Sequence, residues 1–382
     1  MDTVWLLNVI TQGEDSKHQF KANVKRSDSL AQEMVAFSNS LGGMILIGVN
    51  DDGSLAGLTP DDIGRLNQLV SNAATEHMRP PIAPVTENIS YPDGMVMVVT
   101  VPEGISKPYM DKNLHVFVKS GADKRKVIAR EELQRMFQSA ALVHADEIPV
   151  RNSSIADVDQ GFFSSFFERE FGESVADQGI SCARLMENMN LMRDGQLNIS
   201  GALLFANRPQ IRLPVYIIKA VAFPGNDIAD EHYIDSRDIS GKLSDIFREA
   251  MSFVLANIRH VQNDQSFNST GVPEIPRIVF EELIANALIH RDYFISAPVR
   301  LLVFADRIEI ISPGGLPNNL TVENVLMGNS NIRNPILASF ASKVLPYRGL
   351  GSGIRRALKA HPDIEFIDDR VGNTFTVIIA RT

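Results

Sequence analysis

The sequence predicts an α+β protein built from three domains. Its 382 residues exceed the length of one ordinary domain. Apolar residues at helical spacing alternate along the chain with short runs of β-branched residues, so both helices and strands are expected. Two polar segments rich in turn-forming residues divide the chain, and the domains are expected at residues 1–145, 146–268 and 269–382.

The composition excludes several classes of protein. No segment approaches the roughly 18 apolar residues of a membrane helix, and the amino terminus lacks the basic region and the length of a signal peptide. The single cysteine, Cys182, excludes an internal disulfide and a cysteine-based zinc site, so we expect a cytoplasmic protein. Because the net charge is −9, any contact with nucleic acid must come from a local basic patch.

The first domain is predicted to be a helix packed on a sheet. A capping-box pattern at Ser29 starts the helix, and Gly42 ends it. Apolar residues repeat at helical spacing between these points, namely Leu30, Met34, Phe37 and Leu41. A buried strand at 44–49 and a hairpin turn at 51–53 follow, and a second helix is expected at 131–142.

The middle domain carries no chemistry that the sequence identifies. Helices are expected at 158–171 and 245–258, and strands at 201–206 and 215–223. The functional expectations therefore rest on the two outer domains.

One helix of the third domain carries a polar stripe. Residues 280–292 predict a helix in which Glu282, Asn286 and His290 fall at i, i+4 and i+8, on one face. Apolar residues flank them, so the stripe would be buried at a considerable free-energy cost unless something binds it. Magnesium with phosphates attached would be such a ligand, since the cation takes oxygen ligands and a phosphate takes donors. The alternative is that these are surface or capped core residues.

Two glycine turns follow this helix. A hairpin at 299–311 leads into Ser312-Pro313-Gly314-Gly315, where glycine allows the backbone to approach a ligand closely. A helix at 334–344 comes next, and three glycines then lead into a further helix: Gly349, Gly351 and Gly353. Free amides and the helix dipole make such a helix start a natural phosphate cradle, although an ordinary helix start would look the same. A strand at 372–379 closes the domain.

The order of these features resembles the ATP-binding GHKL, or Bergerat, fold of gyrase, heat-shock chaperones and histidine kinases. The resemblance covers residues 272–382 and is closest to the short form that follows a Schlafen/AlbA-type domain in RecG-like transcriptional regulators. It implies an α/β sandwich with ATP and magnesium as ligands. Glu282 would orient the attacking water as a general base, Asn286 would bind magnesium, and His290 would contact phosphate.

The same resemblance assigns the remaining site residues. Gly314 would lie beside the adenine, and Gly349, Gly351 and Gly353 would lie beneath the phosphates. Ser312 stands where the wider superfamily has an aspartate that reads the adenine amino group. A hydroxyl can accept that hydrogen bond but is neutral and shorter, so we expect ATP binding rather than rapid hydrolysis.

The first domain resembles the Schlafen/AlbA-type nucleic-acid-binding domain over residues 8–138, on the strength of the segment 33–53. The middle domain is similar to the connector of the same proteins. Some members of the Schlafen/AlbA family are nucleases with two acidic residues five positions apart. Glu14 occupies the first position here, but Gln19 occupies the second, ahead of Phe20 and Lys21. Because an amide cannot supply the charge that divalent metal ions require, we expect binding rather than cleavage.

Basic clusters in this domain indicate how nucleic acid would bind. Between Lys112 and Arg135, seven Lys and Arg residues outnumber three acidic ones. Such clusters suit contacts with a phosphate backbone, and solvated surface charge is the equal alternative. The candidate contacts are Lys21, Lys25, Arg26, Lys119, Lys124, Arg125 and Lys126.

Three functions remain open on the sequence. The leading one is an ATP-binding, nucleic-acid-binding regulator, a homo-oligomer in which nucleotide occupancy controls the amino-terminal domain or the assembly. The second is an enzyme, either a slow ATPase or a metal-dependent nuclease, and the third is an interaction scaffold that binds no nucleotide. A helicase is excluded because the sequence has no Gly-x4-Gly-Lys-Ser/Thr loop, and a histidine kinase because no dimerisation helix with a phospho-acceptor histidine is visible.

Overall fold

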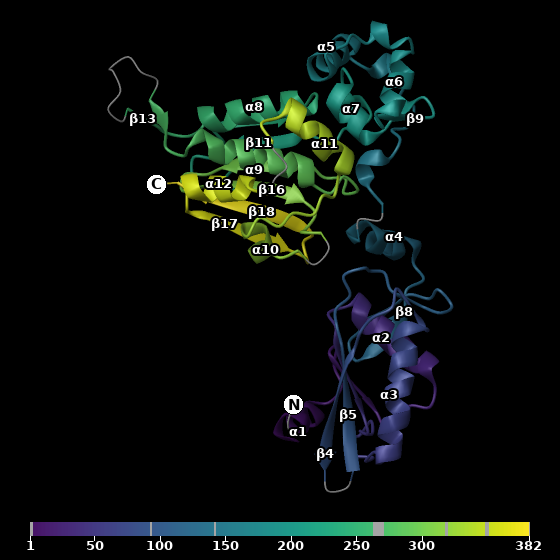
Figure 1. Cartoon of the computed structure of the whole chain (residues 1–382). Helices are drawn as coiled ribbons and strands as arrows, with labels where there is room; N and C mark the ends of the chain where they lie inside the picture. The colour runs from purple at the N-terminus through teal and green to yellow at the C-terminus, as the bar shows by residue number, and fades with distance from the viewer. Residues whose placement is uncertain are drawn as a thin grey trace. The chain divides into compact units, whose positions relative to one another are not determined.

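The computed structural model shows an α+β protein with two compact units (Figure 1). One unit ends at Val143 and the other begins at His144. The predicted fold class is therefore confirmed. The structure describes residues 3–91, 94–140, 143–262, 271–317, 320–347 and 351–381.

The first unit contains a four-stranded sheet in the order β1-β2-β5-β4. β1 (His18–Lys21) runs parallel to β2 (Gly43–Ile47), whereas β5 (Gly94–Val101) is antiparallel to both β2 and β4 (Val85–Tyr91). The elements around this sheet are α1 (Thr3–Gln12), α2 (Ser27–Asn39), α3 (Pro60–Thr75), β3 (Met78–Arg79), β6 (Met110–Asp111), β7 (Phe117–Ser120), β8 (Asp123–Lys126) and α4 (Arg130–Ser139).

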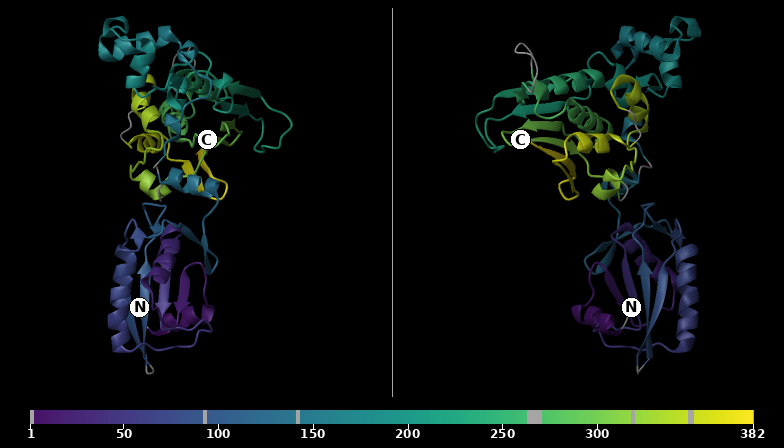
Figure 2. Two further views of the ribbon diagram at one scale, coloured as in Figure 1. Left: turned by 90° about the vertical axis from the view of Figure 1, so that its right-hand side faces the viewer. Right: turned by 60° about the vertical axis from the view of Figure 1, so that its left-hand side comes forward.

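Helices cover both faces of this sheet. α2 and α3 share a core with Ile45 and Ile47 of β2, whereas α1 packs with Leu46 on the other face, as the alternation of a strand requires. α3 runs alongside the strands in both views of Figure 2. The predicted start of α2 at Ser29 is wrong, because the helix begins at Ser27. Asp28 in the first turn favours the earlier start, since the helix dipole stabilises a carboxylate there.

The second unit is built on a six-stranded sheet in the order β12-β11-β15-β16-β18-β17. Its strands are β11 (Ile218–Ala222), β12 (Asp235–Ile239), β15 (Val299–Val303), β16 (Arg307–Pro313), β17 (Ile364–Asp369) and β18 (Thr374–Ala380). β11 and β15 are parallel, and every other neighbouring pair is antiparallel. Because β11 and β12 come from the predicted middle domain, two of the predicted domains contribute to one sheet. The division into three domains stays a prediction.

Helices bury their apolar side chains against this sheet. α8 (Leu243–Ala256) and α9 (Arg277–His290) share one core with residues of β11, β15, β16 and β18. α12 (Gly353–Ala360) contacts α9 (Figure 1). The remaining elements are η1 (Ala145–Glu147), η2 (Ile155–Asp157), α5 (Gln160–Phe171), η3 (Ala176–Gln178), α6 (Cys182–Asn188), β9 (Met192–Arg193), β10 (Gln196–Leu197), α7 (Ile199–Phe205), η4 (Pro209–Ile211), β13 (His260–Val261), β14 (Val272–Pro273), α10 (Val322–Leu326) and α11 (Pro335–Val344).

One predicted element has the wrong type. The strand expected at 201–206 is part of helix α7, in which every residue is buried. The side chain of Asn198 caps this helix by accepting a hydrogen bond from Gly201 N at 2.7 Å. A short buried apolar run fits a helix or a strand equally well, so the cap decides the outcome. None of the helices in the described parts of the chain is long and apolar enough to cross a bilayer.

The carboxyl end of α9 is held by the side chain of Asn334. This side chain is fully buried, and its Nδ2 donates to Ile289 O at 2.8 Å and to Arg291 O at 2.9 Å. Carbonyls at a helix end have no partner within the helix, so these two bonds satisfy groups that would otherwise be unpaired. Asn334 therefore fixes the end of the helix that carries the polar stripe.

The first residues of the second unit bind to the loop between α10 and α11. His144 Nδ1 donates to Arg333 O at 3.0 Å. Two residues later, the buried carboxylate of Asp146 accepts from Leu337 N at 3.0 Å in the first turn of α11. The start of this unit is thus attached to both ends of one short segment, 333–337.

We predict that Asn334→Ala lowers the free energy of unfolding by about 2 kcal/mol, because two buried carbonyls lose their donor. Chemical denaturation monitored by circular dichroism would measure the loss. Asn207→Ala is the matched control, since that asparagine side chain is exposed. Equal midpoints for the two variants would contradict the anchoring role.

Candidate functional site

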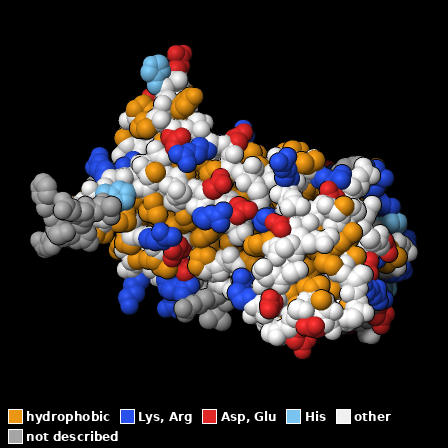
Figure 3. All heavy atoms as spheres, turned by 90° about the horizontal axis from the view of Figure 1, so that it is seen from above, with side chains coloured by type: hydrophobic (Ala, Val, Ile, Leu, Met, Phe, Trp, Pro, Cys, Tyr) orange, Lys and Arg blue, Asp and Glu red, His pale blue; other side chains and the backbone are white. Residues whose placement is uncertain are grey.

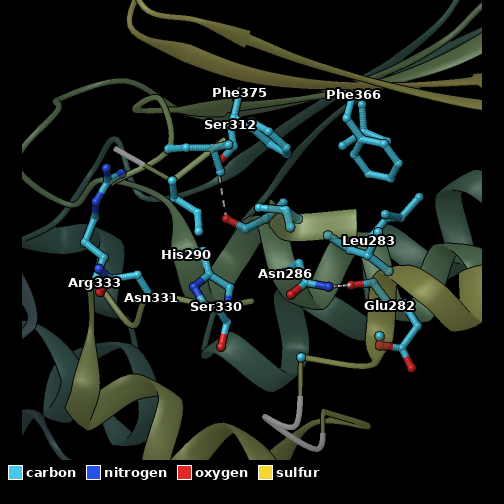
Figure 4. Close-up of a pocket in the computed structure, with 18 of the residues that line it drawn as sticks. Glu282, Leu283, Asn286, His290, Ser312, Ser330, Asn331, Arg333, Phe366 and Phe375 are labelled. Carbon is cyan, nitrogen blue, oxygen red and sulfur yellow. Dashed lines mark hydrogen bonds between the residues drawn. The ribbon is translucent and has the colours of Figure 1, made fainter. Parts of the chain in front are cut away.

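A pocket in the second unit lies between α9, the sheet and the loops around α10 and α12 (Figure 4). Seven predicted nucleotide-site residues line it: Glu282, Asn286, His290, Ser312, Gly314, Gly351 and Gly353. The eighth, Gly349, lies outside the described residues. The polar stripe of α9 and both glycine turns therefore meet at one cavity.

The lining of this pocket combines apolar and polar surface. Figure 4 shows Phe366 and Phe375 on the side of the sheet, with Leu283 of α9 near Phe366. The polar side chains that the same view labels are Glu282, Asn286, His290, Ser312, Ser330, Asn331 and Arg333. A ligand with a flat apolar group and a polar or charged remainder would match both kinds of surface.

Asn286 presents an oxygen atom to the pocket. Its Nδ2 donates to Glu282 O, one helical turn earlier, at 2.6 Å. A carbonyl can only accept, so this bond fixes which end of the amide faces the helix. The amide oxygen is left on the other side of the group (Figure 4), and an oxygen of this kind is a suitable ligand for magnesium.

Glu282 lies against the start of α12. The residue is 2% exposed, and its Oε1 is 2.5 Å from Arg356 Nη2 in an ion pair. A Cβ atom at Gly353 would overlap Glu282 Oε2, so a side chain at 353 would displace the carboxylate. The glycine expected beneath the phosphates therefore also leaves room for the Glu282 carboxylate.

The other glycines also mark close contacts of the backbone. Gly351 has φ +66°, and a Cβ atom there would overlap Gly328 O. Gly314 has φ +95°, and its Cβ would lie 2.5 Å from Arg333 Nη1. L-residues rarely adopt such φ angles, and these neighbours leave no room for a side chain. The pocket wall is thus formed largely by closely packed loops.

Ser312 is positioned to accept a hydrogen bond from a ligand. The residue is buried, and its Oγ donates to Ala287 O of α9 at 3.3 Å. The hydroxyl proton is then used, whereas the oxygen lone pairs stay available beside the pocket. This arrangement suits an amino group such as that of adenine, through a neutral rather than a charged acceptor.

His290 lies beside Tyr347 and is neutral at pH 7. Its Nε2 is 3.1 Å from Tyr347 Oη in a hydrogen bond. Burial, and secondly the positive charge of Arg333, lower the pKa of His290 to about 4. The sequence predicts a basic phosphate contact at this position, whereas the structure holds an uncharged imidazole there. The role of His290 as a phosphate contact stays a prediction.

Two arginines of this site were not identified from the sequence. Arg356 pairs with Glu282, and Arg333 donates through Nη2 to Gly315 O at 2.7 Å. Burial lowers the pKa of Arg333, an effect that the carboxylates of Asp292 and Asp368 oppose. Arg333 ends the mostly polar segment 328–333, which begins with a glycine and lies between two helical segments. That segment was the sequence signal that could have identified Arg333 as a site residue.

In the first unit, Gln19 bridges a carboxylate and an ammonium group. Its Nε2 donates to Glu14 Oε1 at 2.5 Å, and its Oε1 accepts from Lys119 Nζ at 2.8 Å. Phe20 N donates to the same Glu14 oxygen at 2.6 Å. The position where related nucleases have a second acid is therefore part of a charge-balanced network. Across the described segments, no group of three His, Cys, Asp or Glu residues could hold a metal ion.

Carboxylates of the same unit neutralise several of its predicted nucleic-acid contacts. Lys124 pairs with Glu33 at 2.7 Å, and the Arg125 guanidinium pairs with Glu132 at 2.5 Å. Arg26 lies 3.5 Å from a carboxylate oxygen of Asp28. Within the part of the chain that the structure describes, four predicted contacts form no ion pair: Lys21, Lys25, Lys119 and Lys126. Of these, Lys119 already donates to Gln19 and to Ala122 O.

Charges of both signs are intermixed on the face of the molecule that Figure 3 shows. The face in Figure 3 shows acidic and basic side chains side by side, with hydrophobic side chains between them. Such a face has no extended positive field to attract a phosphate backbone. The cations of the first unit thus remain the candidates for nucleic-acid contact.

Comparison with known protein families identifies two domains in the chain. Residues 14–128 match the family described as "Schlafen, AlbA_2", and residues 296–379 match the family described as "Putative ATP-dependent DNA helicase recG C-terminal". The chain therefore contains an AlbA-type domain and a RecG-like carboxy-terminal domain, as the resemblance implied. The GHKL assignment stays a prediction.

Two solved structures are similar to parts of the chain. A crystal structure of a protein from Corynebacterium diphtheriae is 20% identical and covers 96% of this chain with a TM-score of 0.46. This chain spans 65% of the length of that structure. The amino-terminal domain of a RecG-related protein from Nitrosomonas europaea is 22% identical, covers 34% of this chain and 96% of its own, and has a TM-score of 0.24. No curated protein matches the sequence.

We predict that His290 makes the folded state less stable as the pH falls from about 6.5 to about 4. The unfolded chain protonates this imidazole near its ordinary pKa of 6.5, whereas the folded protein resists protonation until about pH 4. The unfolded state therefore binds more protons in that interval, and stability rises with pH, by up to about 3 kcal/mol from this residue.

Denaturant midpoints measured between pH 4.5 and pH 7.5 would test this prediction. The midpoint of His290→Asn should depend less on pH than that of the wild type. His232→Asn changes an exposed histidine, so its midpoint should follow the wild-type pH dependence. Parallel curves for the wild type and His290→Asn would show that His290 does not resist protonation.

Proposed function

We propose that this protein is a cytoplasmic regulator that binds ATP and magnesium in its second unit and nucleic acid through its first. Nucleotide occupancy would control the first unit or the assembly of a homo-oligomer. The single observation that carries the proposal is the convergence of the polar stripe of α9 and both glycine turns on one pocket. These features are separated by up to 71 positions in the sequence, from Glu282 to Gly353, and a shared ligand site would give them a common purpose.

The chemistry of the pocket supports a nucleotide as the ligand. Asn286 would supply an oxygen for magnesium, and the first residues of α12 line the same cavity, where free backbone amides at a helix start would serve as donors for phosphate. The rings of Phe366 and Phe375 offer a surface for a flat base, and Ser312 offers an acceptor for its amino group. One site thus provides a partner for each part of ATP.

Tight binding with slow turnover is the form of this activity that the geometry favours. A general base must be within reach of the attacking water, and Glu282 is instead paired with Arg356 at 2.5 Å. A slow ATPase remains the second candidate, because rearrangement of that pair would free the carboxylate. The GHKL resemblance supports a role for Glu282 as the general base of that ATPase.

Binding without cleavage is the form that the first unit favours. Gln19 stands between Glu14 and Lys119, so the ammonium group balances the carboxylate that a metal ion would otherwise neutralise. Lys21, Lys25 and Lys126 supply charge for a phosphate backbone. A metal-dependent nuclease and a nucleotide-free scaffold are the alternatives that the two experiments below would reveal.

We predict that Asn286→Ala lowers the affinity for magnesium and a non-hydrolysable ATP analogue by at least about tenfold, since it removes a metal ligand. Isothermal titration calorimetry of the wild type, Asn286→Ala and the exposed control Asn207→Ala would measure the change. An unchanged affinity in Asn286→Ala would refute the site assignment, and a flat titration of the wild type would favour the scaffold.

We also predict that removing three basic side chains weakens binding of DNA or RNA. Each lost phosphate contact should reduce the slope of log affinity against log salt by roughly 0.7–0.9. Fluorescence anisotropy over a salt series would compare a triple alanine variant at Lys21, Lys25 and Lys126 with one that removes equal charge from exposed sites of the second unit, at Arg184, Arg193 and Arg248. Identical slopes would exclude these contacts, and magnesium-dependent cleavage of the probe would favour the nuclease.

A further inference from the structure

Arg356 lies where the polar stripe meets the start of α12. Its side chain is 33% exposed and lines the pocket, three residues after Gly353. The partner carboxylate of Glu282 is 3% exposed, so the ion pair lies in the wall of the pocket with the carboxylate shielded from solvent. Neither the glycine pattern nor the polar stripe assigns a role to this arginine.

The pair leaves one donor of Arg356 unsatisfied. Arg356 Nε is buried and, within the described residues, has no hydrogen-bond partner, although Nη2 contacts Glu282. A buried donor without an acceptor costs free energy, so this arrangement is not the best that a guanidinium can make. An acceptor with several oxygens at the same place would satisfy more of its N–H groups.

A phosphate group is such an acceptor, and it would compete with Glu282 for the arginine. Both groups are anions that accept from a guanidinium, and both would lie beside the glycine turn at Gly351 and Gly353. Two anions sharing one cation repel each other, so binding of the second weakens the hold on the first. A carboxylate released in this way would stand next to the phosphate rather than against the arginine.

We propose that Arg356 binds a phosphate of the nucleotide by exchanging its partner, so that the Glu282–Arg356 ion pair forms in the nucleotide-free protein and breaks when a nucleotide binds. This inference rests on the proposed function and names the residue that distinguishes a nucleotide from a nucleoside. Arg356 acts on the ligand directly, and Glu282 acts through its competition for Arg356.

The two partners should respond to neutral substitutions in opposite directions. Arg356→Gln removes the phosphate donor and should weaken binding of the ATP analogue about tenfold. Glu282→Gln removes the competing anion and should strengthen it, while the double variant should show no such gain. Adenosine, which has no phosphate, should bind all of these variants equally.

Calorimetric titrations with magnesium plus the ATP analogue, and separately with adenosine, would test this exchange. Arg355→Gln is the matched control, because Arg355 is the exposed neighbour on the same helix. Arg356→Lys keeps the charge and should retain part of the affinity, which separates loss of the contact from loss of folding.

The outcomes separate this inference from the proposed function. If the wild type binds no ATP analogue, the proposed function fails. If the wild type binds it and Arg356→Gln matches Arg355→Gln, the phosphate contact is refuted while the proposed function stands. The proposed exchange of partners would also be overturned if Glu282→Gln raised the affinity for the ATP analogue and the double variant kept that gain. A loss of adenosine binding in Arg356→Gln would overturn it as well.

Discussion

The close contact between Glu282 on α9 and Gly353 on α12 is the constraint on which the pocket depends. Because a Cβ atom at 353 would overlap the carboxylate, a larger residue there would displace the Glu282 side chain from this position. Arg356 then supplies the positive charge that a carboxylate buried at this position requires. The position of a Cβ at 353 would also be 3.6 Å from Asn286 Nδ2, so the same approach places the amide beside the glycine turn.

The features that the sequence predicted correctly are those set by short-range patterns. The spacing of Glu282, Asn286 and His290 defines one face of a helix wherever that helix lies, and glycine runs mark turns by their own conformational freedom. The helix and both turns were therefore predictable, and so was their meeting at one pocket, once their order was compared with a known fold. The use of that pocket as a nucleotide site stays a prediction.

The features that the sequence did not reveal depend on contacts between distant segments. Arg356 is one of two adjacent arginines, and only the packing of α12 on α9 decides which of them meets Glu282. Arg333 is directed to the turn after β16 by a backbone carbonyl at Gly315. The helix α7 was mistaken for a strand because its cap at Asn198 lies outside the apolar run. Likewise, no local sequence pattern predicts that β11 pairs with β15. The first two residues paired in register, Ile218 and Val299, are 81 positions apart in the chain.

The attachment of His144 to Arg333 links the first residues of the second unit to the wall of the pocket. The carbonyl that binds His144 belongs to a residue whose side chain lines the pocket, and the next residue holds the end of α9. A ligand that shifts the main chain at 333 would have to break the bond to His144 or move His144 with it. The wall of the pocket and the first residues of the second unit are therefore joined directly, by hydrogen bonds within that unit.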